Sequence, residues 1–125
     1  MKKKRKICVI INNRANYARI KSVLEEIKKN KNLKLQIVLA SSSILDRFSS
    51  ITEIIKKDGF KIDYKLYTLV DGENLVTMAK STGLSIIEFT SALSKLKPDI
   101  ALVVADRYET LAAAISASYM NIFLA

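Results

Sequence analysis

Short apolar runs alternate with stretches of helical periodicity along this chain, and this alternation constrains the fold more than any other feature. The first run covers residues 7–11 and the second covers residues 35–39. Both are short, continuous and partly β-branched, as expected of strands buried on both faces. Between them, Ile20, Leu24 and Ile27 fall on one face of a helix. Further strands are predicted at residues 63–69, 100–104 and 121–125.

Three more helices are predicted between these strands. The first carries Ile51 and Ile55 on its apolar face and ends near Gly59, because glycine favours the left-handed conformation after a helix end. The second covers residues 74–96, with Gly83 as a break or kink. The third is marked by apolar and aromatic residues at helical spacing: Tyr108, Leu111, Ile115 and Tyr119.

This order of elements predicts an α/β fold of the Rossmann-like type. Continuous apolar strands need cover on both sides, and parallel strands need crossovers, which the helical stretches supply. The fold is therefore expected to be a mostly parallel sheet of about five strands with flanking helices. Residues 7–125 are expected to form this domain, preceded by a basic tail over residues 1–6. The alternating strand at 63–69 is expected near a sheet edge.

The basic tail accounts for much of the charge. The chain of 125 residues carries a formal net charge of +9, and the five basic residues at positions 2–6 supply more than half of it. Such a tail could contact RNA or another polyanion, and a non-catalytic α/β binding module is the alternative function class. However, no aromatic residues are interleaved with these charges, so a solvated run is the favoured interpretation and nucleic acid is not the expected partner.

The apolar run after the tail is too short for a targeting or membrane segment. It covers residues 7–11 and is followed by Asn12, Asn13 and Arg14. A secretory signal needs about 7–15 apolar residues and a membrane span about 18 or more. The chain is therefore predicted to be cytoplasmic, with no membrane partner.

Several familiar chemistries are excluded by composition. The sequence has no histidine, so it cannot supply a Ser-His-Asp site or a histidine-based metal site. Its single cysteine, Cys8, lies within an apolar strand pattern and is interpreted as a core residue. Neither a dinucleotide-binding glycine motif nor a Walker A loop is present. No cofactor and no metal are therefore expected.

The loops at the carboxyl ends of the strands are where a parallel sheet binds ligands. In the first of these loops, Arg14 is expected at or just before a helix N-terminus. A cation there opposes the helix dipole, while the exposed backbone N–H groups favour an anion. A bound phosphate would reconcile Arg14 with this position. A solvated arginine is the equally weighted alternative.

The loop after the fourth strand carries Asp106, Arg107 and Glu109. Asp106 could act as an acid or base at the rim, with Arg107 as a second cation. Alternatively, Asp106 is the N-cap of the next helix and Glu109 completes a capping box. After the second strand, Ser42 could contact a phosphate, although capping of the next helix is the favoured interpretation.

Four segments resemble the UDP-N-acetylglucosamine 2-epimerase family, in particular the hydrolysing branch that supplies sialic and legionaminic acid synthesis. They are RANYARIK, LASSSILDRF, MAKSTGLSIIEF and KPDIALVVADRYETLAAAISASYMNI. The last of these is the most specific, and the resemblance covers residues 7–122.

The resemblance implies one Rossmann-like half of a two-domain glycosyltransferase-B arrangement. Family members of this branch eliminate the nucleoside diphosphate from a UDP- or GDP-linked N-acetylamino sugar and then add water, with inversion at C2. By match, Asp106 would be a catalytic carboxylate and Arg14 would contact the phosphate region of the nucleotide. Ser42 and Arg107 are further candidate substrate-binding residues because of their places in the loops. The family continues into a second domain, so the chain is expected to be an N-terminal part that is inactive alone. Homo-oligomer formation is left open.

Overall fold

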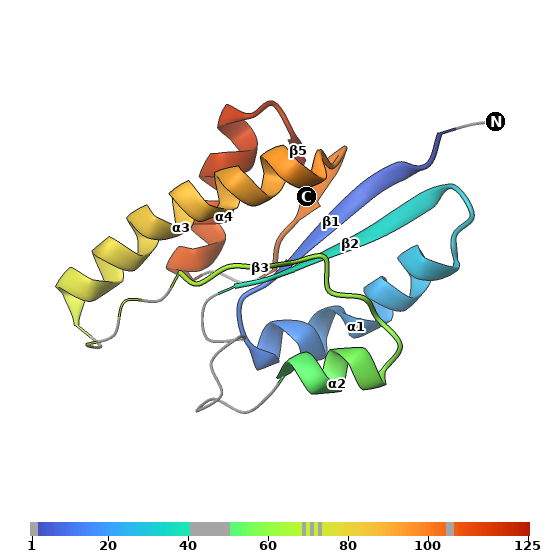
Figure 1. The fold of residues 1–125 in the computed structure, drawn as a ribbon, viewed down its shortest axis with the longest axis horizontal. Helices are drawn as coiled ribbons and strands as arrows, with labels where there is room; N and C mark the ends of the chain where they lie inside the picture. Colours follow the sequence, from blue (N-terminus) through green and yellow to red (C-terminus); the bar gives the residue numbers. More distant parts are fainter. Residues whose placement is uncertain (1–2, 41–50, 69, 71, 73, 105–106) are drawn as a thin grey trace.

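The computed structural model describes the chain except for residues 1–2, 41–50, 69, 71, 73 and 105–106. Within the described residues, the strands form a five-stranded parallel sheet in the order β3-β2-β1-β4-β5, as shown in Figure 1. The predicted α/β fold is therefore confirmed. The strands are β1 (Arg5–Ile11), β2 (Leu33–Leu39), β3 (Tyr64–Lys65), β4 (Ile100–Leu102) and β5 (Phe123–Leu124).

Strand β1 is the centre of the sheet. It pairs with β2 along its whole length and with β4 through Ile7 to Val9. It begins two residues earlier than predicted, because the amide of Arg5 donates to the carbonyl of Asn32 at 3.0 Å. The amide of Lys6 likewise donates to Asp99 Oδ2 at 2.7 Å. Two of the five clustered basic residues therefore belong to the sheet rather than to a tail.

Four helices cover the two faces of the sheet in the part of the chain that the structure describes. They are α1 (Arg14–Lys29), α2 (Ile51–Lys57), α3 (Leu75–Leu96) and α4 (Tyr108–Tyr119). Figure 1 shows α1 and α2 on one face and α3 and α4 on the other. Alternate residues of β1 feed the two cores: Val9 and Ile11 pack with α1 and α2, and Cys8 and Ile10 pack with α3 and α4.

The predicted break at Gly83 is wrong, since α3 runs without interruption for 22 residues. An interior glycine costs about 1 kcal/mol relative to alanine, which a long packed helix can offset. The helix is also well started, because Asn74 and Thr77 form a capping box. A Cβ atom at Gly83 would meet nothing within 4 Å, so no neighbouring group requires a glycine there.

The predicted apolar face of α4 is also wrong in part. Leu111 and Tyr119 are exposed, and the buried face carries Glu109 and small residues instead. Small side chains let α4 approach α3 closely, and the hydroxyl of Ser116 donates across the contact to the carbonyl of Ile86 at 3.1 Å. The small buried residues of α4 are Ala112, Ala113, Ser116 and Ala117.

The remaining elements follow the sequence more closely. Gly59 has φ +90°, and the amide of Phe60 donates to the carbonyl of Ile55, which confirms the predicted glycine end of α2. Strand β3 lies at a sheet edge as expected but is only two residues long. Cys8 is fully buried, as predicted. None of the helices that the structure describes is both long and apolar enough to cross a bilayer.

Candidate functional site

The order of the strands defines a ligand-binding position in the sheet. From β1 the chain moves outward through β2 to β3, and it then returns to place β4 on the other side of β1. The strand order therefore reverses between β1 and β4. In open parallel sheets, ligands bind beyond the carboxyl ends of the strands at such a reversal. The loops that follow β1 and β4 are thus the candidate site.

The turn from β1 to α1 is held by three asparagines. Asn13 is the N-cap of α1, and its side chain accepts from the amide of Asn16 at 2.9 Å. The amide of Asn12 in turn donates to the side chain of Asn16 at 3.1 Å. Asn12 and Asn16 are each only 3% exposed. These buried contacts fix the backbone at the point where Arg14 begins the helix.

Arg14 is the first residue of α1 and is exposed, and the first turn of the helix has no acidic residue. The predicted position at a helix N-terminus is confirmed. A cation there is disfavoured by about 0.3–1 kcal/mol, whereas an anion is favoured. The role of Arg14 in ligand binding stays a prediction.

The turn from β4 to α4 uses charged residues instead. Arg107 is the N-cap of α4 and makes no side-chain capping hydrogen bond. Its Nη2 lies 3.4 Å from Oε1 of Glu109, whose side chain is 3% exposed. The Arg107 guanidinium carbon also lies 5.6 Å from the centre of the Tyr108 ring. The guanidinium therefore has an acidic neighbour and an aromatic neighbour from the first turn of the same helix.

The capping alternative for this loop is wrong. It placed Asp106 at the N-cap and Glu109 three residues later, but the helix begins one residue further along the chain. Glu109 is thus the second residue of α4, and its carboxylate meets Arg107 rather than completing a capping box. Asp106 itself lies outside the described residues, and so does Ser42.

Polar residues of the loop before α3 have structural partners. The side chain of Asn74 caps α3 and its Nδ2 donates to the carbonyl of Gly72 at 3.2 Å. The amide of Val70 donates to Oγ of Ser81 at 2.8 Å, and Ser81 is buried. Val70 and Gly72 are therefore tied to α3 and to its N-cap residue.

The clearest pKa shifts lie away from the loops that follow β1 and β4. Burial, reinforced by the negative charge of Asp63, raises the pKa of the Cys8 thiol to about 12. A hydrogen bond from Tyr17, 2.5 Å from the carboxylate oxygen, together with Lys21, holds the pKa of Asp58 below its usual value. Cys8 is thus a protonated core residue, and Asp58 joins α1 to the end of α2. Among the described residues, no three His, Cys, Asp or Glu side chains are grouped to hold a metal ion.

A family model for UDP-N-acetylglucosamine 2-epimerase matches residues 25–125. The chain belongs to this family. Among curated relatives, the hydrolysing GDP/UDP-N,N'-diacetylbacillosamine 2-epimerase of Campylobacter jejuni is 33% identical over 119 residues, which are 95% of this chain and 31% of the relative. The hydrolysing UDP-N,N'-diacetylbacillosamine 2-epimerase of Legionella pneumophila is 30% identical over 118 residues, or 94% of this chain and 31% of that protein.

Solved structures of the family share the fold. A UDP-N-acetylglucosamine 2-epimerase crystal structure superposes with a TM-score of 0.83 at 20% identity, over 98% of this chain and 32% of the other. The Neisseria meningitidis UDP-GlcNAc 2-epimerase bound to UDP-GlcNAc gives a TM-score of 0.79 at 21% identity, over 95% and 31%. The chain thus spans about a third of the length of its family relatives.

Two features of the candidate site were missed from the sequence. One is the Asn13 cap, which the spacing of Asn13 and Asn16 in the first turn could have indicated. The other is the ion pair between Arg107 and the buried Glu109, which lie two positions apart across the start of a helix. From the sequence alone, the side chain of Glu109 was expected to bond to the backbone at the start of the helix, because a capping box was the simpler explanation.

Proposed function

We propose that this chain is the N-terminal part of a hydrolysing sugar-nucleotide 2-epimerase. The substrate would be a UDP- or GDP-linked N-acetylamino sugar, and the products an N-acetylmannosamine-type sugar and the free nucleotide. Residues 7–125 would form the Rossmann-like half of a two-domain enzyme, with its ligand edge facing the second half. Family membership supports this reaction, as does the name of each hydrolysing relative.

One observation carries the proposal. Arg14 and Arg107 begin the helices that follow β1 and β4, the two strands between which the strand order reverses. A nucleoside diphosphate is an anion that arginines bind through charge-assisted hydrogen bonds. A helix N-terminus favours an anion, and the Arg107 guanidinium has more donors than its contact with Glu109 uses, so a diphosphate at the rim would interact with both turns. Ser42, in the loop after β2, is the third proposed substrate contact.

Asp106 is the proposed catalytic carboxylate, since it lies in the sequence between β4 and Arg107. In the elimination step, a base removes the proton from C2, the C1–oxygen bond to the diphosphate breaks, and a C1–C2 double bond forms. Addition of water to C1 and of a proton to the opposite face of C2 then gives the inverted sugar. A carboxylate at this rim could serve one of these proton transfers. Other acids would have to come from outside the chain.

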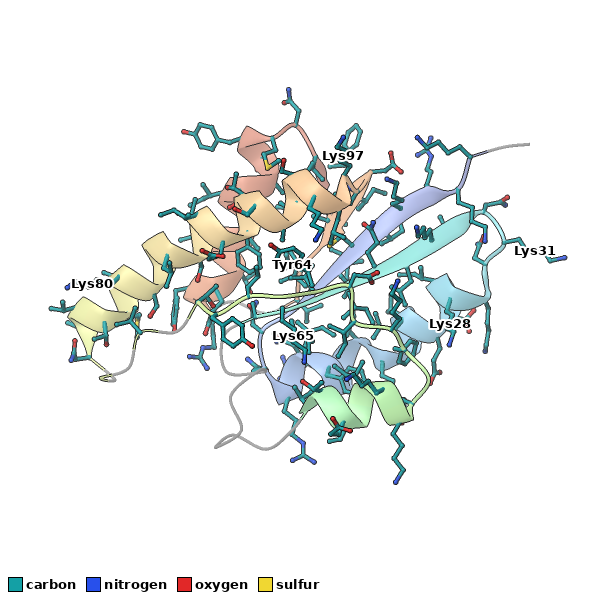
Figure 2. All side chains as sticks on the ribbon, viewed as in Figure 1. Lys28, Lys31, Tyr64, Lys65, Lys80 and Lys97 are labelled. Carbon is teal, nitrogen blue, oxygen red and sulfur yellow. The ribbon has the colours of Figure 1, made fainter. Side chains whose placement is uncertain are left out.

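The RNA-binding alternative has no support in the structure. Arg5 and Lys6 belong to β1, and Figure 2 shows Lys31, Lys80 and Lys97 at three separate places on the molecule. We therefore propose a sugar nucleotide as the partner. A cytoplasmic location and homo-oligomer formation stay predictions from the sequence.

The decisive experiment uses the complete enzyme, meaning residues 1–125 joined to the segments that the relatives carry beyond the matched region. We expect it to release UDP or GDP from a nucleotide-linked N-acetylamino sugar, measured by a coupled nucleotide assay. Residues 1–125 alone should show no turnover, because both walls of the cleft are needed to position the substrate. No release by the complete enzyme with either nucleotide would contradict the proposal.

A further inference from the structure

Glu109 is a charged residue in the first turn of α4, yet its side chain is buried. Its side chain is 3% exposed, and it is the only charged side chain among the buried residues that the structure describes. Taking a carboxylate out of water is costly unless a partner and hydrogen-bond donors compensate for it. For Glu109 the compensation comes from its place in the first turn of α4 and from Arg107, whose Nη2 lies 3.4 Å from its Oε1.

Support of the helix alone does not account for this arrangement. A carboxylate in the first turn interacts with the helix dipole equally well from the solvent side, as acidic residues do in many helices. An ion pair with a half-exposed partner adds little stability, and the Arg107 side chain is 55% exposed. The buried position of Glu109 instead places its carboxylate where it can hold the half-exposed Arg107 side chain.

Arg107 is held from two directions. Glu109 engages one terminal nitrogen of the guanidinium, and the ring of Tyr108 lies 5.6 Å from its central carbon. A guanidinium carries five N–H donors in a planar fork. The contact with Glu109 engages one terminal nitrogen, so the Arg107 guanidinium has further N–H donors. Two such donors can bind two oxygens of one phosphate group at the same time.

We infer that Glu109 is a positioning residue that holds the Arg107 guanidinium at the carboxyl end of β4 for the diphosphate of the nucleotide. Glu109 does not touch the ligand; it acts through Arg107. The arrangement lowers the entropy that Arg107 loses when the ligand binds, because the side chain is already confined. This inference rests on the proposed function, which supplies the diphosphate.

A double-mutant cycle in the complete enzyme tests the inference. UDP affinity is measured by titration calorimetry for wild type, Glu109→Gln, Arg107→Ala and the double variant. We expect Arg107→Ala to weaken UDP binding about ten- to a hundredfold. Glu109→Gln should weaken it severalfold in wild type and have no effect once Arg107 is absent. Glu88→Gln, on α3 away from the rim, is the matched control and should bind as wild type does.

Two results would overturn the inference. One is unchanged UDP affinity in a folded Glu109→Gln variant. The other is an effect of Glu109→Gln that persists in the Arg107→Ala background, since this would mean that Glu109 acts by another route. If Glu109→Gln lowers stability, Glu109→Asp keeps the charge and should recover part of the affinity, whereas its failure to do so would also contradict the inference.

A second measurement separates this inference from the proposed function. The order of the Arg107 side chain can be followed by ¹⁵N relaxation at Nε without any ligand. We expect the order parameter to fall in Glu109→Gln and to stay unchanged in Glu88→Gln. If the wild-type enzyme binds neither UDP nor GDP, the proposed function fails by itself. An equally ordered Arg107 in Glu109→Gln would overturn the positioning role regardless of the ligand.

Discussion

The two turns that flank the reversal of strand order place an arginine at the rim by different means. The turn after β1 is built from neutral amides, with Asn13 capping α1 and Asn16 bridging back to Asn12. The turn after β4 has no side-chain cap on α4, and a buried carboxylate, Glu109, faces the arginine instead. The first turn fixes the backbone under its arginine, whereas the second fixes the side chain itself.

This difference indicates that the two arginines contribute differently to ligand binding. Arg14 is exposed on a rigid turn, and nothing acidic lies in the first turn of its helix. An anion is favoured at that helix N-terminus, where Arg14 adds positive charge. Arg107 is already paired, so its charge is partly compensated and its orientation is defined. We expect Arg14 to contribute mainly attraction and Arg107 mainly geometry.

The largest effect is expected at Asp106, in the turn after β4. In the complete enzyme, Asp106→Asn should lower kcat by about 10²- to 10⁴-fold, because an amide cannot exchange a proton as a carboxylate does. The melting temperature should change little, since Arg107 and not Asp106 is the N-cap of α4. Asp99→Asn, just before the amino end of β4 and therefore at the other end of the strands, is the control and should keep its activity. Wild-type turnover by Asp106→Asn would remove the catalytic assignment.

The caps predict a smaller effect on stability that differs between the turns. Asn13→Ala removes the side chain that accepts from the amide of Asn16 and should cost about 0.5–2 kcal/mol of unfolding free energy. Asn13→Asp keeps an acceptor and should cost less. Arg107→Ala removes no capping hydrogen bond, but it leaves the buried Glu109 carboxylate without its ion-pair partner, so its cost should largely disappear in the Glu109→Gln background. A cost of Arg107→Ala in urea denaturation that persists in that background would show that the two turns do not differ in this way.

The smallest effect concerns the contact between Tyr17 on α1 and Asp58 at the end of α2. The hydrogen bond from Tyr17 and the nearby Lys21 hold the pKa of Asp58 below its usual value. The stabilisation is therefore present above the unfolded pKa of about 3.9 and is lost as the pH falls through the lower folded value. Asp58→Asn should lose less stability than wild type between pH 5 and pH 2, measured by thermal melts. Parallel pH curves for the two proteins would contradict this assignment.

The fold was largely predictable because hydrophobic pattern decides it. Continuous apolar runs at β1 and β2 required a parallel sheet, and the helical stretches between strands supplied the crossovers. The errors arose where the hydrophobic pattern of the sequence does not match the face that packs in the structure. Large residues at helical spacing predicted the buried face of α4, but close approach to α3 selects small residues, so Leu111 is exposed and Ala113 is buried.

The sequence predicted where the candidate site lies, but not which side-chain contacts form there. The rim followed from the alternation of strands and helices, which predicts a parallel sheet, and Arg14 was placed at the N-terminus of the first helix; the structure bears out the parallel sheet and this helix position. The contact between Arg107 and Glu109 could not be predicted, because a shift of one residue in the start of α4 decides whether Glu109 caps the helix or meets the arginine. Helix ends are set by local hydrogen bonds that many sequences satisfy in more than one way.

The central claim is that both turns serve one anion site, and the affinity of the complete enzyme for UDP tests it most directly. Titration calorimetry would compare wild type with Arg14→Ala, Arg107→Ala and the double variant, with Arg19→Ala, on the exposed side of α1, as the control. We predict that each rim variant binds UDP about ten- to a hundredfold more weakly, that the double variant binds more weakly still, and that Arg19→Ala binds as wild type does. Wild-type affinity in the folded double variant would contradict the account.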